Sequence, residues 1–257
     1  MNPASAAVVR APGGRVPGPV VRLDRVSVCY YEHIALSDVS LEIPARAFAA
    51  IIGPNGAGKT TLLTVVNGLG DIRGGRVEVL DTVLDRRTVR GLRCRIGYVP
   101  QHLNVDPRAP INCREAVLLG RVGRAGLLRR LSAADRAAAD RALELTGVSR
   151  LADRPVGHLS GGEARKVSLA RVIAQEPEIL LLDEPLSNLD PRAADELEAL
   201  VVRLHRRLDL TTILVTHRVD RLPPAVTRVI LLKDARVVFV GDRAAALAPD
   251  RVAALFA

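Results

Sequence analysis

The stretch of sequence that decides the fold consists of Gly53, Pro54, Asn55, Gly56, Ala57, Gly58, Lys59, Thr60 and Thr61. It fits the pattern G-x-x-x-x-G-K-[ST], in which glycines let the backbone wrap around phosphate oxygens and a following helix presents its positive end. The apolar run over 47–52 predicts a buried strand before it, and the run over 59–69 predicts a helix after it. We therefore expect a phosphate site in which Lys59 neutralises the β- and γ-phosphates and the Thr60 hydroxyl holds Mg²⁺.

A second apolar run, over 179–182, ends at two carboxylates, Asp183 and Glu184. Asp183 is suited to hold Mg²⁺, directly or through water, and Glu184 to orient and polarise the water that attacks the γ-phosphorus. Acidic residues at the end of a strand can also simply begin a loop. Together with the glycine loop, however, the pair predicts hydrolysis of a nucleoside triphosphate.

The segments around these motifs alternate between strand and helix patterns. Short alternating runs over 21–43 predict antiparallel strands, whereas the chain between 101 and 159 has a helical pattern. In that helical region, Ser132 and Asp135 have the spacing of a capping box at the start of a helix.

Two strand–helix units follow in the last third of the chain. The strand over 179–182 precedes a helix over 191–208, for which Asp190 predicts the N-cap, and a strand over 212–216 precedes a shorter helix. The alternation predicts an α/β protein.

Composition narrows the classes of protein to which the chain can belong. Of the 257 residues, 48% are apolar and 25% charged, as in globular proteins, and we expect no membrane-spanning segment. The first twenty residues lack the apolar core of a signal peptide and predict a flexible tail, and the three scattered cysteines fit a reducing compartment. The net charge of +9 comes without any Trp, so we expect no stacking platform for nucleic acid.

A third motif, downstream of Lys59 and upstream of Asp183, consists of Leu159, Ser160, Gly161, Gly162 and Glu163. With these motifs in this order, the chain resembles the nucleotide-binding subunits of ABC transporters over roughly residues 21–240. The resemblance implies an α/β P-loop NTPase (RecA-like) core with an N-terminal antiparallel β-subdomain. It also implies a helical subdomain inserted at about 103–160, within an ABC ATPase domain over 21–257 that follows a tail over 1–20.

The resemblance also implies roles for single residues outside the glycine loop. Tyr30 matches the aromatic that stacks on adenine, with Tyr31 as an alternative. Gln101 matches the glutamine that reaches Mg²⁺ and the attacking water. His217 matches the histidine that contacts the γ-phosphate, and Asp190 matches a residue that acts in communication across a dimer.

In this family the ATP site is completed by a second subunit. The resemblance implies that Lys59 and Glu184 of one subunit face Ser160 and Gly162 of the other across ATP, with the Gly161 amide and Glu163 in the same motif. We therefore expect a homodimer, or a heterodimer with a related cassette, on a separate integral membrane permease. That places the chain on the cytoplasmic face of the inner or plasma membrane, without nucleic acid as a partner.

The segment over 101–130 resembles the cassettes of importers of zinc, manganese or ferrous iron. Importers of iron-siderophores, haem or cobalamin are close alternatives, and an exporter, a lipid-extraction complex or a soluble ABC ATPase are others. The five histidines are scattered, so a transported metal would be selected by a solute-binding protein and the permease. The basic residues Arg121, Arg124, Arg129 and Arg130 predict either contact with anionic lipid or a solvated helix end.

Overall fold

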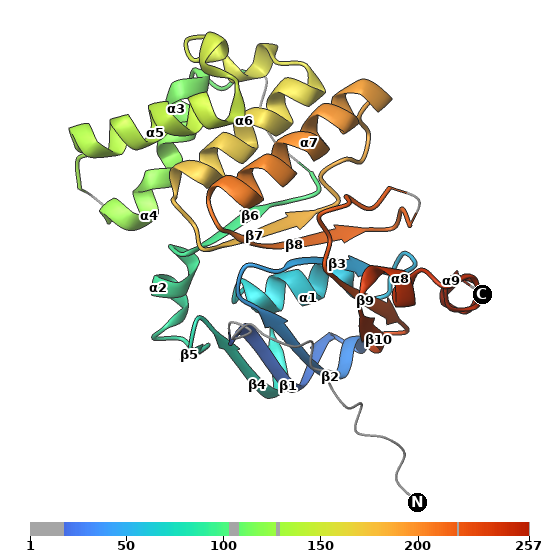
Figure 1. Ribbon diagram of the computed structural model, residues 1–257. Coiled ribbons are helices and arrows are strands. Elements are labelled where there is room, and N and C mark those ends of the chain that lie inside the picture. Colours follow the sequence, from blue (N-terminus) through green and yellow to red (C-terminus); the bar gives the residue numbers. More distant parts are fainter. Residues whose placement is uncertain (1–17, 103–107, 127–128, 220, 257) are drawn as a thin grey trace, which may run out of the picture.

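The computed structural model describes residues 18–102, 108–126, 129–219 and 221–256. It contains two β-sheets, with one helix between them and a layer of helices on the far side of the larger sheet (Figure 1). All but the last three residues of the predicted tail over 1–20 lie outside the described residues, and the first strand begins at Pro19.

The larger sheet has the strand order β10-β9-β3-β8-β7-β6. Its strands are β3 (Phe48–Ile52), β6 (Ile96–Val99), β7 (Ile179–Asp183), β8 (Thr211–Thr216), β9 (Arg228–Lys233) and β10 (Arg236–Gly241). All neighbouring pairs are parallel except β9 and β10. Strands β3 and β7 are buried along their whole length, and their sequences are apolar runs except for Asp183 at the end of β7, as is typical of a parallel sheet covered on both faces.

The smaller sheet is antiparallel and has the order β2-β1-β4-β5. Its strands are β1 (Pro19–Tyr30), β2 (His33–Pro44), β4 (Ile72–Val79) and β5 (Thr82–Val83). The antiparallel strands predicted over 21–43 are confirmed as β1 and β2. The sequence analysis did not identify β4 and β5, which follow the glycine loop in the sequence and complete this sheet.

Helix α1 (Lys59–Val66) lies between the two sheets and shares one core with both (Figure 1). Alternate residues of β3 face opposite sides, so Ala49 and Ile51 pack in this core, whereas Phe48, Ala50 and Ile52 pack under the outer helices. The predicted helix over 59–69 ends earlier, at Val66, because Gly68 adopts a left-handed φ of +68°.

The outer layer consists of α6 (Gly161–Ala174), α7 (Pro191–Arg207) and a group of helices between β6 and α6 in the sequence. This group contains α3 (Cys113–Leu118), η1 (Leu119–Arg121), α4 (Val122–Ala125), α5 (Ala133–Thr146), η2 (Ser149–Leu151) and η3 (Val156–His158). The remaining helices are α2 (Val89–Arg93), α8 (Arg243–Ala246) and α9 (Pro249–Phe256). Residues 103–107 and 127–128 of the predicted helical subdomain lie outside the described residues.

Two helix starts predicted from the sequence are confirmed. Ser132 and Asp135 form the capping box of α5, and the Asp190 carboxylate caps α7 by accepting a bond from the Ala193 amide. The short helix expected after β8 is wrong, because the described residues between β8 and β9 contain no helix. Pro223 and Pro224 lie in this segment, and their missing amide hydrogens oppose helix formation there.

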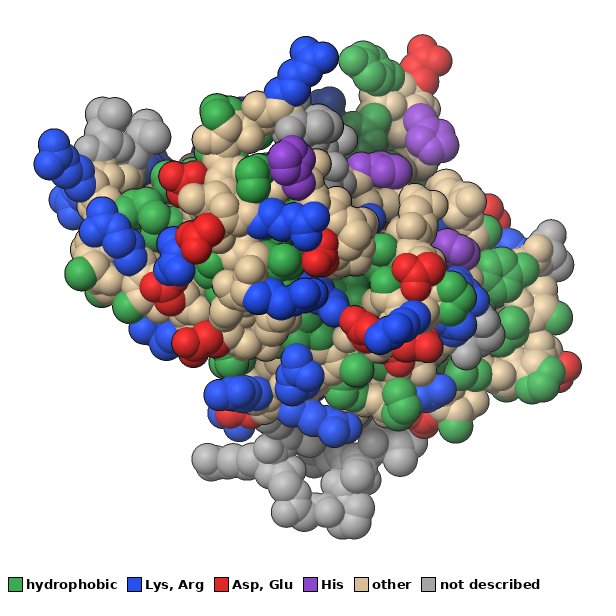
Figure 2. Space-filling model, turned by 90° about the horizontal axis from the view of Figure 1, so that it is seen from above, with side chains coloured by type: hydrophobic (Ala, Val, Ile, Leu, Met, Phe, Trp, Pro, Cys, Tyr) green, Lys and Arg blue, Asp and Glu red, His purple; other side chains and the backbone are tan. Residues whose placement is uncertain are grey.

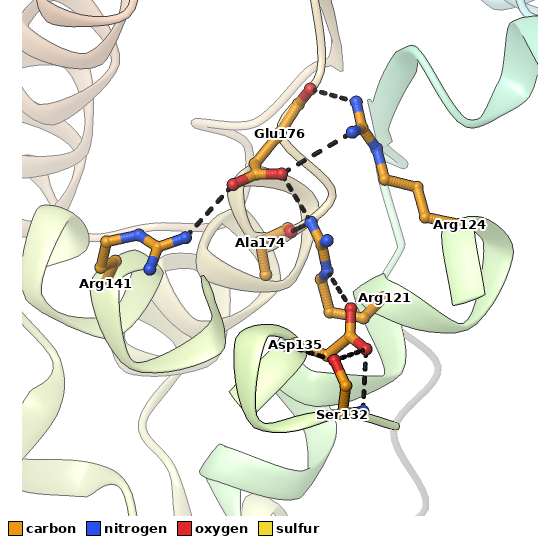
Figure 3. A network of polar contacts seen from close by, with 7 residues as sticks. All are labelled: Arg121, Arg124, Ser132, Asp135, Arg141, Ala174 and Glu176. Carbon is orange, nitrogen blue, oxygen red and sulfur yellow. Dashed lines mark hydrogen bonds and ion pairs between the residues drawn. The ribbon is translucent and has the colours of Figure 1, made fainter. Parts of the chain in front are cut away.

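A polar network joins α4, α5 and the end of α6 (Figure 3). The Arg121 guanidinium binds the Asp135 carboxylate, the Ala174 carbonyl and the Glu176 carboxylate at 2.8–2.9 Å. Arg124 and Arg141 also contact Glu176. Arg121 and Arg124 are therefore engaged within the protein, which argues against contact of these two arginines with lipid.

On the surface of the helical layer, charges of both signs are mixed. Figure 2 shows Lys and Arg side chains interspersed with Asp and Glu across this face. The excess of positive charge therefore does not form one continuous basic surface on this side of the molecule.

Candidate functional site

The glycine loop connects the end of β3 to the start of α1, as its sequence predicts. Gly58 has a φ of +98°, and a Cβ there would lie 2.3 Å from the Ala35 carbonyl oxygen. At Gly53, a Cβ would lie 2.1 Å from the Leu232 carbonyl oxygen. Only glycine fits these two positions, where the loop backbone packs directly against the backbone of Leu232 and of Ala35.

Lys59 is the first residue of α1 and is buried. Its Nζ donates hydrogen bonds to the carbonyl oxygens of Gly53 at 3.0 Å and Pro54 at 2.8 Å. Burial lowers the pKa of Lys59, and the nearby carboxylates of Glu184 and Asp183 act against that shift. The ammonium group of Lys59 is therefore held inside the loop by two neutral acceptors, which phosphate oxygens can replace.

Asp183 ends β7 and is 1% exposed. The Thr60 hydroxyl donates to its Oδ1 at 3.2 Å, and the Tyr98 hydroxyl donates to its Oδ2 at 3.3 Å. Burial raises the pKa of Asp183, and burial next to this carboxyl raises the pKa of Tyr98 to about 12. Asp183 and Thr60 are brought together as predicted, whereas the contact with Tyr98 was not anticipated.

Glu184 follows β7 with a φ of +43°, which is uncommon for a residue with a side chain. Its amide donates to the Val215 carbonyl oxygen of β8, and this bond fixes the turn. The side-chain Oε2 accepts a bond from Gln101 Nε2 at 3.1 Å and lies 3.3 Å from His217 Nδ1. Gln101 and His217, which are far from Glu184 in the sequence, therefore both contact its carboxylate.

The motif over 159–163 begins α6, with Ser160 at the N-cap. The Ser160 Oγ accepts a bond from the Glu163 amide and donates one to the Glu163 carboxylate, and this carboxylate also accepts from the Ser160 amide. Glu163 also contacts the guanidinium groups of Arg150 and Arg154. These bonds hold the exposed start of α6 in a fixed shape.

Tyr30 and Tyr31 lie at the turn between β1 and β2. Tyr30 is 41% exposed, whereas Tyr31 has a left-handed φ of +54° and is fully exposed. Both rings are therefore accessible to a planar ligand.

Sequence reasoning missed a buried arginine, Arg165, two residues after Glu163. Its Nη1 and Nη2 donate to the carbonyl oxygens of Pro100 and Gln101. A signal was present in the sequence, because Arg165, Leu169 and Val172 have the i, i+4, i+7 spacing of one buried helix face.

Two features are absent from the described residues. The described part of the chain contains no group of three or more His, Cys, Asp or Glu side chains that could hold a metal ion. Likewise, none of its helices is long and apolar enough to span a bilayer.

Comparison with known proteins identifies the family. The family model described as "ABC transporter" matches residues 36–187. The zinc import ATP-binding protein ZnuC of Halorhodospira halophila is 36% identical over 238 residues, which cover 93% of this chain and 83% of the relative. The manganese transport system ATP-binding protein MntB of Bacillus subtilis is 38% identical and covers 77% and 76% of the two chains. The phosphonates import ATP-binding protein PhnC of Nocardia farcinica is 36% identical and covers 92% and 90%.

Solved structures agree with this assignment. CbiO1 of Clostridium perfringens, part of the ABC transporter complex cbiONQ, has a TM-score of 0.79 at 30% identity and covers 91% of this chain and 93% of its own. A dimeric ATP-binding cassette, MJ0796, in a post-hydrolysis state with ADP and Pi, has a TM-score of 0.74 at 28% identity and covers 87% and 98%. The chain therefore belongs to the ABC transporter family, as an ATP-binding subunit that hydrolyses ATP.

Proposed function

We propose that two copies of the chain close around ATP, that Glu184 is the catalytic carboxylate, and that the cycle drives a separate permease importing a metal ion. The observation that carries the catalytic part is the meeting of Gln101 and His217 on the Glu184 carboxylate. This carboxylate stands beside the buried Asp183 and near enough to Lys59 to act on its pKa. A base, two orienting groups and a phosphate site thus lie together.

ATP binding uses the glycine loop and the start of α1. The amides of the loop and the positive end of the helix bind the phosphate chain. Lys59 exchanges its bonds to the Gly53 and Pro54 carbonyls for bonds to the β- and γ-phosphates. The adenine stacks on the exposed ring of Tyr30, with Tyr31 as the alternative.

The residues present fit Mg²⁺. The Thr60 hydroxyl and the Asp183 carboxylate oxygen lie 3.2 Å apart, and both are oxygen donors, which this ion prefers. Gln101 uses its amide nitrogen on Glu184, which leaves its amide oxygen for the ion. When bound, Mg²⁺ neutralises charge on the β- and γ-phosphate oxygens. The absence of a larger acidic cluster among the described residues is compatible with an ion held mainly by phosphate oxygens and water.

Hydrolysis then follows from the position of Glu184. Its carboxylate accepts a proton from a water molecule as the water oxygen bonds to the γ-phosphorus and the bond to the β-phosphate oxygen breaks. Gln101 and His217 hold the carboxylate in place, and His217 also contacts the γ-phosphate. ADP and inorganic phosphate leave, and the proton passes from Glu184 to the phosphate.

The second copy supplies the start of its α6. Ser160 and the amides of Gly161 and Gly162 lie at the N-terminal end of that helix, which favours an anion, and Ser160 is exposed. Asp190, at the start of α7, acts in communication between the copies. Ser160→Arg places a bulky cation at this end, so in a Glu184→Gln background we expect ATP-dependent dimers to disappear in light scattering while the monomer keeps its circular dichroism spectrum. Dimers at the level of Glu184→Gln alone would contradict this arrangement.

A groove of about 650 Å³ between α2, β6, α4 and α6 offers a site for the permease. Apolar side chains line it, of which Leu119 is exposed and Val89 and Val122 are half-buried, and Arg90, Arg93 and Arg171 lie around them. This lining fits a short apolar helix flanked by acidic residues. The permease thereby holds the ATPase at the cytoplasmic face of the membrane.

The cargo is proposed from the relatives to which the chain is similar. The zinc and manganese relatives support metal import, and the phosphonate relative, at similar identity, supports import of a phosphonate as the second candidate. The solute-binding protein and permease would select either cargo. Affinity purification of tagged Glu184→Gln from detergent-solubilised native membranes in ATP is expected to recover a polytopic permease. Uptake of zinc, manganese, iron and a phosphonate by cells with and without the gene then identifies the cargo; unchanged uptake of all three metals contradicts metal import.

A further inference from the structure

Arg165 is buried and has no acidic partner among the described residues. It is 8% exposed on α6, and within the described ranges no hydrogen bond or ion pair joins it to a carboxylate. Its two partners are the carbonyl oxygens of Pro100, at 2.9 Å, and Gln101. Burial lowers the pKa of Arg165. Removing this charge from water costs free energy on folding. Two neutral acceptors offset a smaller part of that free energy than a carboxylate would.

The two carbonyl groups that bind Arg165 belong to the segment that presents Gln101. Strand β6 ends at Val99, so the next two carbonyls lie beyond the sheet, and β6 is the last strand on that side. A planar guanidinium with parallel donors can bind two successive carbonyls and fix the direction of the backbone. The direction of the Gln101 backbone in turn determines where its side-chain amide points.

We propose that Arg165 is a positioning residue, which holds the Gln101 backbone so that the Gln101 amide reaches Glu184. Because α6 begins at the Ser160 motif, Arg165 also couples contact between that motif and ATP on the partner subunit to the geometry of Gln101. A shift of the start of α6 moves the carbonyl-bound guanidinium and with it the Gln101–Glu184 bond. The inference rests on the catalytic role proposed above for Gln101 and Glu184.

The test compares steady-state ATPase kinetics of the purified full chain and its variants. Arg165→Gln is expected to lower kcat about tenfold, because a misplaced catalytic group loses rate, with KM for ATP changed less than about twofold. Arg165→Lys retains the charge and can bind one carbonyl, so its kcat is expected to lie between those of Arg165→Gln and the wild type. Arg206→Gln makes the same replacement at an exposed position of α7 and is expected to keep the wild-type kcat.

A double-mutant cycle separates positioning from a general structural role. In a Gln101→Ala background, Arg165→Gln is expected to change kcat by less than about twofold, because the group it positions is gone. A full additional tenfold loss in that background would overturn the inference. If Arg165→Gln does not fold, as shown by circular dichroism and Tm, Arg165→Lys takes its place in the same cycle, and a loss of kcat in the Gln101→Ala background as large as its loss in the wild type overturns the inference.

The outcomes also distinguish this inference from the proposed function. A wild-type kcat in Gln101→Ala removes the catalytic role of Gln101, and the inference with it. A slow Gln101→Ala beside a wild-type kcat in Arg165→Gln overturns the inference alone.

Discussion

The side-chain amide of Gln101 donates a hydrogen bond to the carboxylate of Glu184, with 3.1 Å between Nε2 and Oε2. The two residues follow different strands, β6 and β7, which are parallel neighbours in the larger sheet. The carboxyl ends of both strands therefore lie on the same side of the sheet as the carboxyl end of β3, which the glycine loop follows. The catalytic geometry proposed here is thus a direct consequence of strand order.

Replacing the buried lysine tests the phosphate site. Lys59→Ala removes the only lysine of the glycine loop and its bonds to Gly53 and Pro54. Loss of a buried charge partner of phosphate is expected to weaken ATP binding about hundredfold, or about 3 kcal/mol. Equilibrium titration with a fluorescent ATP analogue measures this loss.

The matched control for this variant is Lys166→Ala. Lys166 forms a partly exposed ion pair with Glu196 on the outer helices. A wild-type affinity is expected for this control, and equal losses in the two variants would mean that the effect of Lys59→Ala is not specific to the loop.

Glu176 tests the network that attaches α4 and α5 to the end of α6. Glu176→Gln weakens the contacts with Arg121, Arg124 and Arg141 and leaves Arg121, whose side chain is 11% exposed, with one carboxylate instead of two. We expect the free energy of unfolding to fall by about 1–2 kcal/mol, because the largely buried guanidinium of Arg121 loses one of its two charged partners. Urea denaturation followed by circular dichroism measures the change.

The control for the network is Glu196→Gln, which disrupts ion pairs with Lys166 and Arg192 on the exposed side of the helices. Exposed pairs contribute little, so a loss of less than about 0.5 kcal/mol is expected. A Glu176→Gln protein as stable as this control would show that the network does not stabilise the fold.

The same carboxylate gives a prediction for pH. Hydrogen bonding from Arg121 lowers the pKa of Glu176 below its ordinary value of 4.5. Because the pKa in the folded state is the lower one, this stabilisation is complete above pH 4.5 and is lost as the pH falls from there through the folded pKa. The free energy of unfolding of Glu176→Gln should therefore decline less steeply than that of the wild type in this acidic range. Parallel slopes in urea titrations at successive pH values would contradict the prediction.

The residues that sequence analysis placed correctly are those whose role is set by local pattern. The glycine loop, the apolar run before Asp183 and the helix caps at Ser132 and Asp190 each need only the chain on either side of them. By contrast, β4 pairs with β1, from which β2, β3 and α1 separate it in the sequence, and β5 pairs with β4. No local pattern records the pairing of β4 with β1. The missing helix after β8 is a different error, because the two prolines in that segment were a local signal that the strand–helix alternation outweighed.

The two polar contacts that were missed depend on tertiary structure. Tyr98 reaches Asp183 because β6 lies next to β7, and Arg165 reaches the Gln101 carbonyl because α6 packs beside β6. Each contact joins segments more than sixty positions apart in the sequence. The helical face that contains Arg165 could have indicated its burial, but only the fold identifies its partners.

The most direct test of the central claim is the turnover of Glu184→Gln. The amide cannot accept a proton from water, so kcat for ATP is expected to fall at least about hundredfold. The dissociation constant for ATP should stay within about twofold of the wild type, since the phosphate site is intact. Light scattering of the same protein in ATP should then show a stable dimer. Wild-type turnover in Glu184→Gln would contradict the assignment of Glu184 as the catalytic carboxylate and, with it, the mechanism proposed here.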